Sequence, residues 1–331
     1  LVAALDAQRG AHGAPLTIVS CDNLPQNGAL LRGLVIAFAS LRAPELAGWI
    51  DAGIAFPSTM VDRIVPATTA DDVEGNDAAL GVRDEAPVVH EPFSQWVIED
   101  RFAAERPAWD AAGATLVHDV DAFESMKLRL LNASHSAFAY LGFLAGHEFI
   151  YQVAQQPPFV AWMRRFMTDE VTPSLVRPPG VDLPAYCDAL VVRFANPALP
   201  HRTQQIAMDG SQKLPQRVLA TVRDNLAANR PVDLAALAVA GWMRYVYGED
   251  EHGATIAVSD PMARDFAMLA ARHRGDPAAF ARGLLALRTV FDDDLGNEPR
   301  FSAPVVRWLT ALFADGARKT VERAALGARG G

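Results

Sequence analysis

The sequence predicts an α/β domain followed by a mainly α-helical domain, on three observations. In the first 118 residues, short β-branched or aromatic runs alternate with amphipathic segments of helical period. From about Asp119 onward, apolar residues recur at a spacing near 3.6, and proline often stands in the first turn of a segment. A chain of 331 residues is long enough for two domains. We therefore expect domains at 1–118 and 119–331.

In the first domain, Thr17–Ser20 is predicted to be a buried strand, and Asn23 follows near its carboxyl end, where open α/β sheets place ligands. Two helices are expected next, over 28–41 and 44–52. The first has Leu30, Leu34 and Phe38 among the residues of its apolar side. Further strands are expected around 56–65 and at 88–90, 96–98 and 115–117, with an acidic linker over 71–77.

The second domain is predicted to be a helical bundle. Its expected helices are 127–146, 148–155, 158–171, 186–194, 201–208, 213–228, 233–247, 261–274, 277–291 and 304–326.

Composition limits the classes of partner. The net charge is −9 and both signs are interspersed, so we expect no nucleic-acid partner. The two cysteines lie far apart without metal-ligand spacing, which indicates neither a disulfide framework nor a cysteine-based zinc site, and we predict no bound metal. Charged residues interrupt the longest apolar runs and no signal peptide opens the sequence, so we expect a cytoplasmic protein without membrane spans.

One helix is apolar on every side and still carries polar residues. It runs from Glu124 to Tyr140, and at about 100° per residue Lys127, Asn132 and His135 share one broad face. Lys127 and Glu124, one turn apart, could form a simple ion pair beside a core histidine. Alternatively, burial lowers the pKa of Lys127 so that it acts as a general base, while the amide and the imidazole hold a polar substrate. Composition leaves both interpretations open.

Several long motifs carry a family resemblance. They are TIVSCDNLPQNG (17–28), FPSTMVDRIVP (56–66), EPFSQWVIEDRF (91–102), KLRLLNASH (127–135) and RFANPALPHRTQQIAMDGSQKLPQR (193–217). Together they resemble the long-chain polyol dehydrogenases, a family that includes mannitol 2-dehydrogenase and fructuronate reductase, also called mannonate dehydrogenase. The resemblance implies a Rossmann-like domain, a helical substrate domain, a site in the cleft between them, NAD as cofactor, a small sugar acid or polyol as substrate, and a monomer.

The resemblance also implies roles for residues. Lys127 matches the family's catalytic lysine, and Asn23 and Asn132 match the two amides that donate to the reacting oxygen. His135 and Lys213 match substrate-binding residues, with Ser211 expected to cap the helix that carries Lys213. In addition, Glu124 resembles a proton-relay glutamate, and Asp62 lies where the family has an aspartate near sugar and cofactor. Taken singly, each residue also has a structural interpretation, such as a turn, an ion pair or a core position.

One departure concerns the substrate. Where the sugar-alcohol members tend to have an arginine, this chain has Gln205, and the surrounding motif resembles the fructuronate reductase branch, whose substrates carry a carboxylate. His201, Arg202 and Arg217 are the nearby basic candidates for that carboxylate, since an arginine fork suits it well, and surface roles are the alternative. The expected reaction is interconversion of D-fructuronate and D-mannonate, with mannitol-type polyol oxidation as the alternative.

A glycine-rich turn that would meet the pyrophosphate of NAD is expected upstream of Asn23 but is not found there. The sequence therefore resembles a family member that begins partway through its cofactor domain. Two other classes stay open. A buried lysine could form a Schiff base as in aldolases, or the chain could be a non-catalytic binding module.

Overall fold

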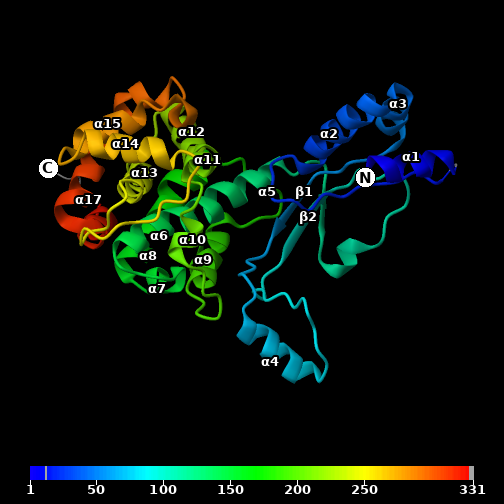
Figure 1. The fold of residues 1–331 in the computed structure, drawn as a ribbon, viewed down its shortest axis with the longest axis horizontal. Helices are drawn as coiled ribbons and strands as arrows, with labels where there is room; N and C mark the ends of the chain where they lie inside the picture. Colours follow the sequence, from blue (N-terminus) through cyan, green and yellow to red (C-terminus); the bar gives the residue numbers. More distant parts are fainter. Residues whose placement is uncertain (12, 328–331) are drawn as a thin grey trace. The chain divides into compact units, whose positions relative to one another are not determined.

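The structure is a computed structural model that describes residues 1–11 and 13–327 (Figure 1). The chain divides into two compact units, Leu1–Ser125 and Met126–Gly331. The first contains a small sheet with helices and the second is mainly helical, so the predicted fold class, a Rossmann-like α/β part followed by a helical domain, is confirmed.

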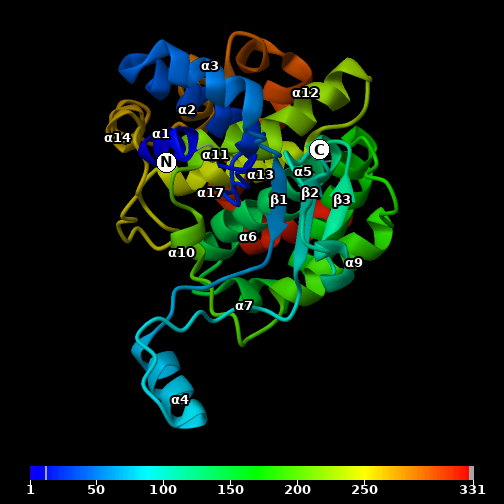
Figure 2. The same cartoon turned by 90° about the vertical axis from the view of Figure 1, so that its right-hand side faces the viewer.

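The sheet of the first unit has the order β1-β2-β3, with β1 at Thr59–Asp62, β2 at Gln95–Glu99 and β3 at Thr115–Val117 (Figure 2). β1 pairs antiparallel with β2, and β2 pairs parallel with β3. A single parallel bridge, Thr17 to Ala55, attaches the segment before the SCDN motif. Residues 17–20 are only half-buried, so the prediction of a fully buried strand there was wrong.

Three helices form the apolar core of the first unit. They are α1 (Val2–Gly10), α2 (Asn27–Arg42) and α3 (Pro44–Gly53), and a cluster that includes Val35 and Ala39 of α2 packs among them. Leu30, Leu34 and Phe38 were expected in this core but are 45%, 61% and 56% exposed. These three side chains lie on a face of α2 next to the one that carries Val35 and Ala39. The short helices α1 and α3 do not cover that face.

Two further predictions in the first unit were wrong. The acidic segment predicted as a linker is a helix, α4 (Ala70–Leu80), because Thr69 and Asp72 form a capping box and Gly81 ends the helix with a left-handed conformation. α4 stands away from the sheet in Figures 1 and 2, and none of its residues is buried. Residues 88–90 form no strand, and Val88 is 65% exposed, so this segment lacks a partner to pair with. The unit is completed by η1 (Trp109–Ala112) and α5 (Asp121–Met126).

The second unit is built around α13 (Asp233–Val246), in which every residue from Leu234 to Val246 is buried. α6 (Ala133–Leu144) and α17 (Pro299–Ala325) pack against it. The helix predicted to be buried on all sides is therefore confirmed as a core element, since α6 is buried from Ala133 to Gly142. The other helices are α7 (Ile150–Ala154), α8 (Pro157–Arg165), α9 (Leu183–Phe194), α10 (Thr203–Ile206), α11 (Gly210–Leu214), α12 (Ala220–Ala227), α14 (Ala263–Arg272), α15 (Pro277–Leu285) and α16 (Arg288–Phe291), with short η4 (Thr172–Ser174) and η6 (Leu295–Asn297).

Three predicted α-helices contain a π-helical turn. These turns are η2 (Lys127–Asn132), η3 (Phe166–Val171) and η5 (Pro215–Leu219). Such turns are rare and occur frequently at functional sites. η2 carries Lys127 and Asn132, and η5 lies against it.

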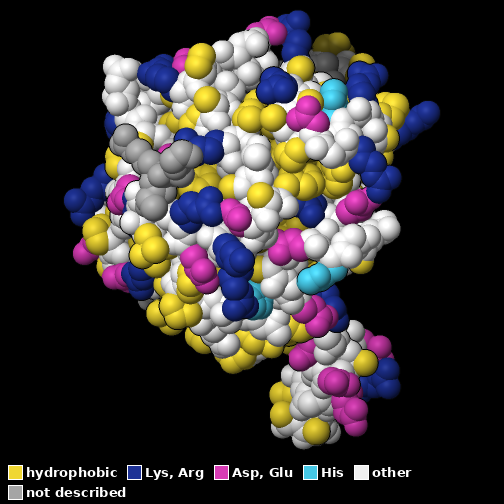
Figure 3. Space-filling model, turned by 90° about the vertical axis from the view of Figure 1, so that its left-hand side faces the viewer, with side chains coloured by type: hydrophobic (Ala, Val, Ile, Leu, Met, Phe, Trp, Pro, Cys, Tyr) yellow, Lys and Arg dark blue, Asp and Glu magenta, His cyan; other side chains and the backbone are white. Residues whose placement is uncertain are grey.

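On the face that Figure 3 shows, basic and acidic side chains are interspersed. Among the helices that the structure describes, none is both long and apolar enough to cross a bilayer. Within the same described residues, no cluster of His, Cys, Asp and Glu has the geometry of a metal site.

Candidate active site

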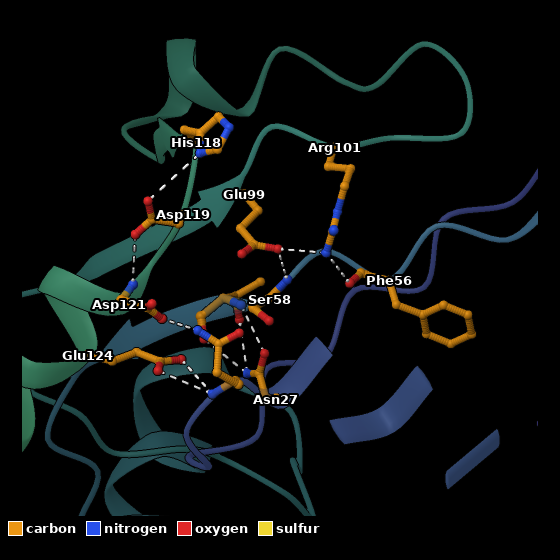
Figure 4. A network of polar contacts seen from close by, with 11 residues as sticks. Asn27, Phe56, Ser58, Glu99, Arg101, His118, Asp119, Asp121 and Glu124 are labelled. Atoms are coloured by element: carbon orange, nitrogen blue, oxygen red, sulfur yellow. Dashed lines mark hydrogen bonds and ion pairs between the residues drawn. The ribbon is translucent and has the colours of Figure 1, made fainter. Parts of the chain in front are cut away.

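A buried amide fixes the backbone segment that precedes Asn23. Asn27, the first residue of α2, is 2% exposed. Its Nδ2 donates to the carbonyl oxygens of Ser20, Asp22 and Thr59 at 3.2, 2.9 and 3.0 Å, and its Oδ1 accepts from the Thr59 backbone N–H at 2.9 Å (Figure 4). The SCDN segment is thus tied to β1, and the exposed residue Asn23 follows directly from this anchored backbone.

Asn23 and Asp62 belong to the same edge of the first unit. The parallel bridge between Thr17 and Ala55 means that the two segments run in one direction, so their carboxyl ends meet at one edge. Asp62 is the last residue of β1 and is 2% exposed. This is the kind of edge at which α/β sheets bind ligands.

Gly28, the second residue of α2, shows how closely this helix approaches β1. A Cβ at that position would lie 2.5 Å from the Pro57 carbonyl oxygen and 2.6 Å from the Ser58 nitrogen. Only glycine allows the approach that brings Asn27 within reach of Thr59.

Glu124 in α5 binds the start of α2. Both of its carboxylate oxygens accept from the Gln26 backbone N–H, at 3.0 and 3.1 Å, and Asp121 binds the Gln26 side chain (Figure 4). A carboxylate is favourable at a helix N-terminus, where backbone N–H groups and the helix dipole present positive charge. The contact fixes α5, whose next turn begins with Lys127. The sequence predicted that Glu124 either pairs with Lys127 or relays protons beside it, and neither expectation included the contact with Gln26.

In the helical unit, Lys127, Asn132 and His135 are each 8% exposed. Two buried atoms among them, Asn132 Oδ1 and His135 Nε2, have no hydrogen-bond partner within the described residues. Native structures pair most buried polar atoms, so an amide and an imidazole left this way are suited to a bound polar ligand.

The His135 ring stacks on Phe194, with centroids 5.2 Å apart, and lies 5.4 Å from the ring of His201. Burial first, and then nearby positive groups, hold the pKa of His135 well below its usual value; these groups are His201, Arg217, Arg193 and Lys213. The imidazole is therefore neutral at physiological pH, and it can donate or accept a hydrogen bond.

Lys213 lies on α11, whose first turn Asp260 organises. Asp260 accepts from the Ser211 backbone N–H at 2.8 Å and from its hydroxyl at 2.6 Å. The expectation that Ser211 caps this helix was wrong, since its hydroxyl donates to Asp260 instead. Lys213 Nζ donates to the Met208 carbonyl at 2.6 Å. Burial, followed by the charge of Arg217, lowers the pKa of Lys213.

Arg217 lies on η5, the π turn that faces η2. Its Nη1 donates to Ser136 Oγ at 2.8 Å and makes a longer contact of 3.5 Å with the Asn132 carbonyl. The side chain is half-buried, and burial lowers its pKa. Arg217 thus joins the surface that carries Asn132 and His135.

The remaining substrate candidates lie in different surroundings. His201 is half-buried beside His135. In contrast, Arg202 is 61% exposed, forms an ion pair with Glu148, and lies over the Phe149 ring. Gln205 is exposed on the short α10.

Sequence reasoning missed a buried polar contact below this surface. Tyr140 OH and Trp242 Nε1 are both buried without partners within the described residues, and both lie against Gly210. A Cβ at Gly210 would stand 2.4 Å from the indole nitrogen and 2.7 Å from the hydroxyl. Burial raises the pKa of Tyr140. Periodicity counted both aromatic residues as apolar core, and only the glycine of the DGSQK motif indicated a close approach.

Comparisons with known proteins agree with this architecture. The family model of the mannitol dehydrogenase Rossmann domain matches residues 1–111, and that of the mannitol dehydrogenase C-terminal domain matches residues 119–313. An uncharacterized oxidoreductase of Escherichia coli, YdfI, is 48% identical over 318 residues, which are 96% of this chain and 65% of the relative. The D-mannonate oxidoreductase of the same organism is 46% identical over 321 residues, 97% of this chain and 66% of the relative.

A solved structure is similar along nearly the whole chain. The Pseudomonas fluorescens mannitol 2-dehydrogenase, in a ternary complex with NAD and D-mannitol, superposes with a TM-score of 0.85 at 40% identity. The match covers 99% of this chain and 66% of that protein, so the chain spans about two thirds of the length of these relatives. Two family models and these relatives place the chain in the mannitol dehydrogenase family.

Proposed function

We propose that this protein interconverts D-fructuronate and D-mannonate with NAD as cofactor. The observation that carries the proposal is that two half-buried cations beside Asn132 and His135, Lys213 and Arg217, are held by a backbone carbonyl and a hydroxyl. Neither Lys213 nor Arg217 forms an ion pair with a carboxylate among the residues that the structure describes. A substrate carboxylate would balance this charge, and a D-mannonate oxidoreductase stands among the relatives.

NAD is supported by the solved relative that binds it and by the edge that carries Asn23 and Asp62. The exposed Asn23 follows a backbone segment that Asn27 fixes, so this edge fits the reacting end of a nicotinamide nucleotide. We assign Asn23 and Asp62 to that end of the cofactor. NAD supplies the hydride acceptor for mannonate oxidation, and its reduced form supplies the hydride for the reverse reaction.

Lys127 is assigned as the general acid and base. Oxidation of the substrate hydroxyl requires one group that removes the proton, and reduction requires the same group to return it. Lys127 is 8% exposed on η2 and lies in the turn that also presents Asn132. Glu124, one turn earlier, is the candidate for passing the proton onward.

Asn132 and Asn23 are assigned to the reacting oxygen. Amide N–H groups aimed at developing alkoxide charge stabilise it, and such donors are commonly worth about 3 kcal/mol of the barrier. His135, held neutral by burial, and Lys213, half-buried on α11, are assigned to the substrate hydroxyl groups. The second unit is accordingly proposed as the substrate domain, over the predicted range 119–331.

A second candidate is oxidation of a polyol such as mannitol. The solved relative with bound D-mannitol favours it. Gln205 and the two cations held by neutral groups, Lys213 and Arg217, favour the sugar acid instead. The cytoplasmic location and monomeric state expected from the sequence stay predictions.

The test is NADH oxidation, followed by absorbance, with D-fructuronate and D-fructose offered in parallel to protein from the full open reading frame that contains this sequence. We expect consumption with fructuronate at a much higher kcat/KM than with fructose. A higher kcat/KM with fructose would support the second candidate, polyol oxidation, in place of the first. Activity with neither would contradict the proposal, and borohydride trapping of a ketose on Lys127 would replace it with Schiff-base chemistry.

A further inference from the structure

Arg217 uses only part of its guanidinium within the protein. Only Nη1 is engaged within the described part of the chain, by the Ser136 hydroxyl and the Asn132 carbonyl. Both partners are uncharged, so they hold the side chain without neutralising it. The edge formed by Nε and Nη2 keeps its N–H donors for a ligand, and this planar edge matches a carboxylate with two parallel hydrogen bonds.

Two neighbouring arginines of this region are arranged differently. Arg223, six residues further along the same helical run, pairs with both Asp292 and Asp294. Arg129 on η2 pairs with Asp224. Arg217 resembles Arg230 and Arg244 instead, which uncharged groups hold within the described residues. What sets Arg217 apart from those two is its place beside Asn132 and Ser136.

The spacing along the helix fits the length of a sugar acid. Ser136, which holds Arg217, follows Asn132 by four residues, a rise of about 6 Å along a helix. In fructuronate, four carbon–carbon bonds separate the keto carbon from the carboxylate carbon, which spans roughly 5 Å in an extended chain. A ketone oxygen bound by Asn132 would thus place the carboxylate one turn further on, beside Arg217.

We propose that Arg217 binds the substrate carboxylate through its free guanidinium edge and so selects sugar acids over uncharged ketoses and polyols. This inference rests on the proposed function and names the residue that gives it specificity. Fructose has a hydroxymethyl group where fructuronate has the carboxylate, so it gains nothing from the charge of Arg217. Arg202, the other arginine of this motif, is exposed and already paired with Glu148, which leaves Arg217 as the better anchor.

The experiment compares Arg217→Met and Arg217→Lys with wild type, using fructuronate and fructose as separate substrates. Loss of a hydrogen-bonded charge pair predicts a fall of about 10- to 150-fold in kcat/KM for fructuronate in Arg217→Met. We expect less than about threefold change with fructose, and an intermediate loss in Arg217→Lys, which keeps the charge but not the fork. The matched control is Arg223→Met, which should leave the ratio of the two kcat/KM values unchanged.

Calorimetric titration gives a second readout that does not depend on turnover. D-mannonate should bind Arg217→Met more weakly than wild type by a similar factor, while D-mannitol binding should not change. Equal losses with both substrates, or no loss with fructuronate, would overturn the inference. If Arg217→Met fails to fold, the inference is tested with Arg217→Lys, by the ratio of its kcat/KM values for fructuronate and fructose. If the wild type does not reduce fructuronate, both the proposed function and this inference are refuted. If the wild type reduces fructuronate and Arg217→Met has the same kcat/KM, only the role of Arg217 is refuted.

Discussion

Substitution of Asn27 by alanine should destabilise the first unit and displace Asn23. The amide of Asn27 supplies donors to Ser20, Asp22 and Thr59 and accepts from the Thr59 N–H. Thr59 is 2% exposed, so water cannot replace these bonds without opening the sheet. Alanine would leave the Thr59 N–H and carbonyl without their partner.

The magnitude follows from the number of buried groups left unpaired. Each costs about 1–3 kcal/mol when its partner is removed, and at least two groups of Thr59 are affected. The expected loss is therefore about 3–5 kcal/mol in the free energy of unfolding of this unit. Asn27→Asp should cost at least as much, because it keeps the acceptor for the Thr59 N–H but places a buried carboxylate oxygen against three carbonyl oxygens.

Urea denaturation followed by circular dichroism measures the loss, and hydrogen exchange at the Thr59 amide reports it locally. The control is Asn76→Ala, since the Asn76 amide on α4 makes a single contact, 3.4 Å long, with Asp84. Equal unfolding midpoints for Asn27→Ala and Asn76→Ala, with the Thr59 amide still protected, would refute the reasoning. If Asn27 positions Asn23 for catalysis, kcat should fall as well, even in protein that remains folded.

Three further substitutions test the site and its scaffold. Lys127→Ala should lower kcat by about 10²- to 10⁴-fold with the fold intact, as expected on removing a general acid and base; near-normal turnover would exclude that role. Burial raises the pKa of Glu170 to about 7, above its ordinary 4.5, so the folded state binds the proton more tightly and stability should fall as pH rises between these values, by up to about 3 kcal/mol. Glu170→Gln should abolish this dependence, and parallel stability profiles for variant and wild type would contradict it. Gly28→Ala should cost about 1–3 kcal/mol through the clash with Pro57 and Ser58, while Gly33→Ala, with open space around its Cα, should be neutral or stabilising in a thermal melt.

The division into an α/β part and a helical part could be predicted from periodicity, because long helices with apolar spacing leave a strong signal. The π turns could not. The segment Lys127–Asn132 consists mostly of good α-helix formers, and its shift to π geometry is not encoded in their propensities. α4 was missed for a different reason, since its acidic composition concealed the Thr69–Asp72 capping box that starts it.

The burial of three candidate residues was predictable, because one helical motif carries all of them. Lys127, Asn132 and His135 lie within nine residues of a segment whose apolar pattern predicts a buried helix, although the π turn from Lys127 to Asn132 changes their angular spacing. The contacts that hold this motif in place come from distant parts of the chain. Glu124 binds Gln26, 98 residues away, and Arg217 binds Ser136, 81 residues away. Such contacts follow from packing and leave no trace in local patterns.

The charge arrangement of the helical unit favours an anionic ligand over a purely structural role for this surface. Burial and the surrounding cations keep His135 neutral, so the surface gains no charge from that residue. Lys213 and Arg217 are bound by a carbonyl and a hydroxyl, which orient a cation without neutralising it. Arg223, in contrast, is paired with Asp292 and Asp294. Partial burial of Lys213 and Arg217 carries a desolvation penalty that their neutral partners do not remove. A bound carboxylate would offset this penalty by pairing with the two cations.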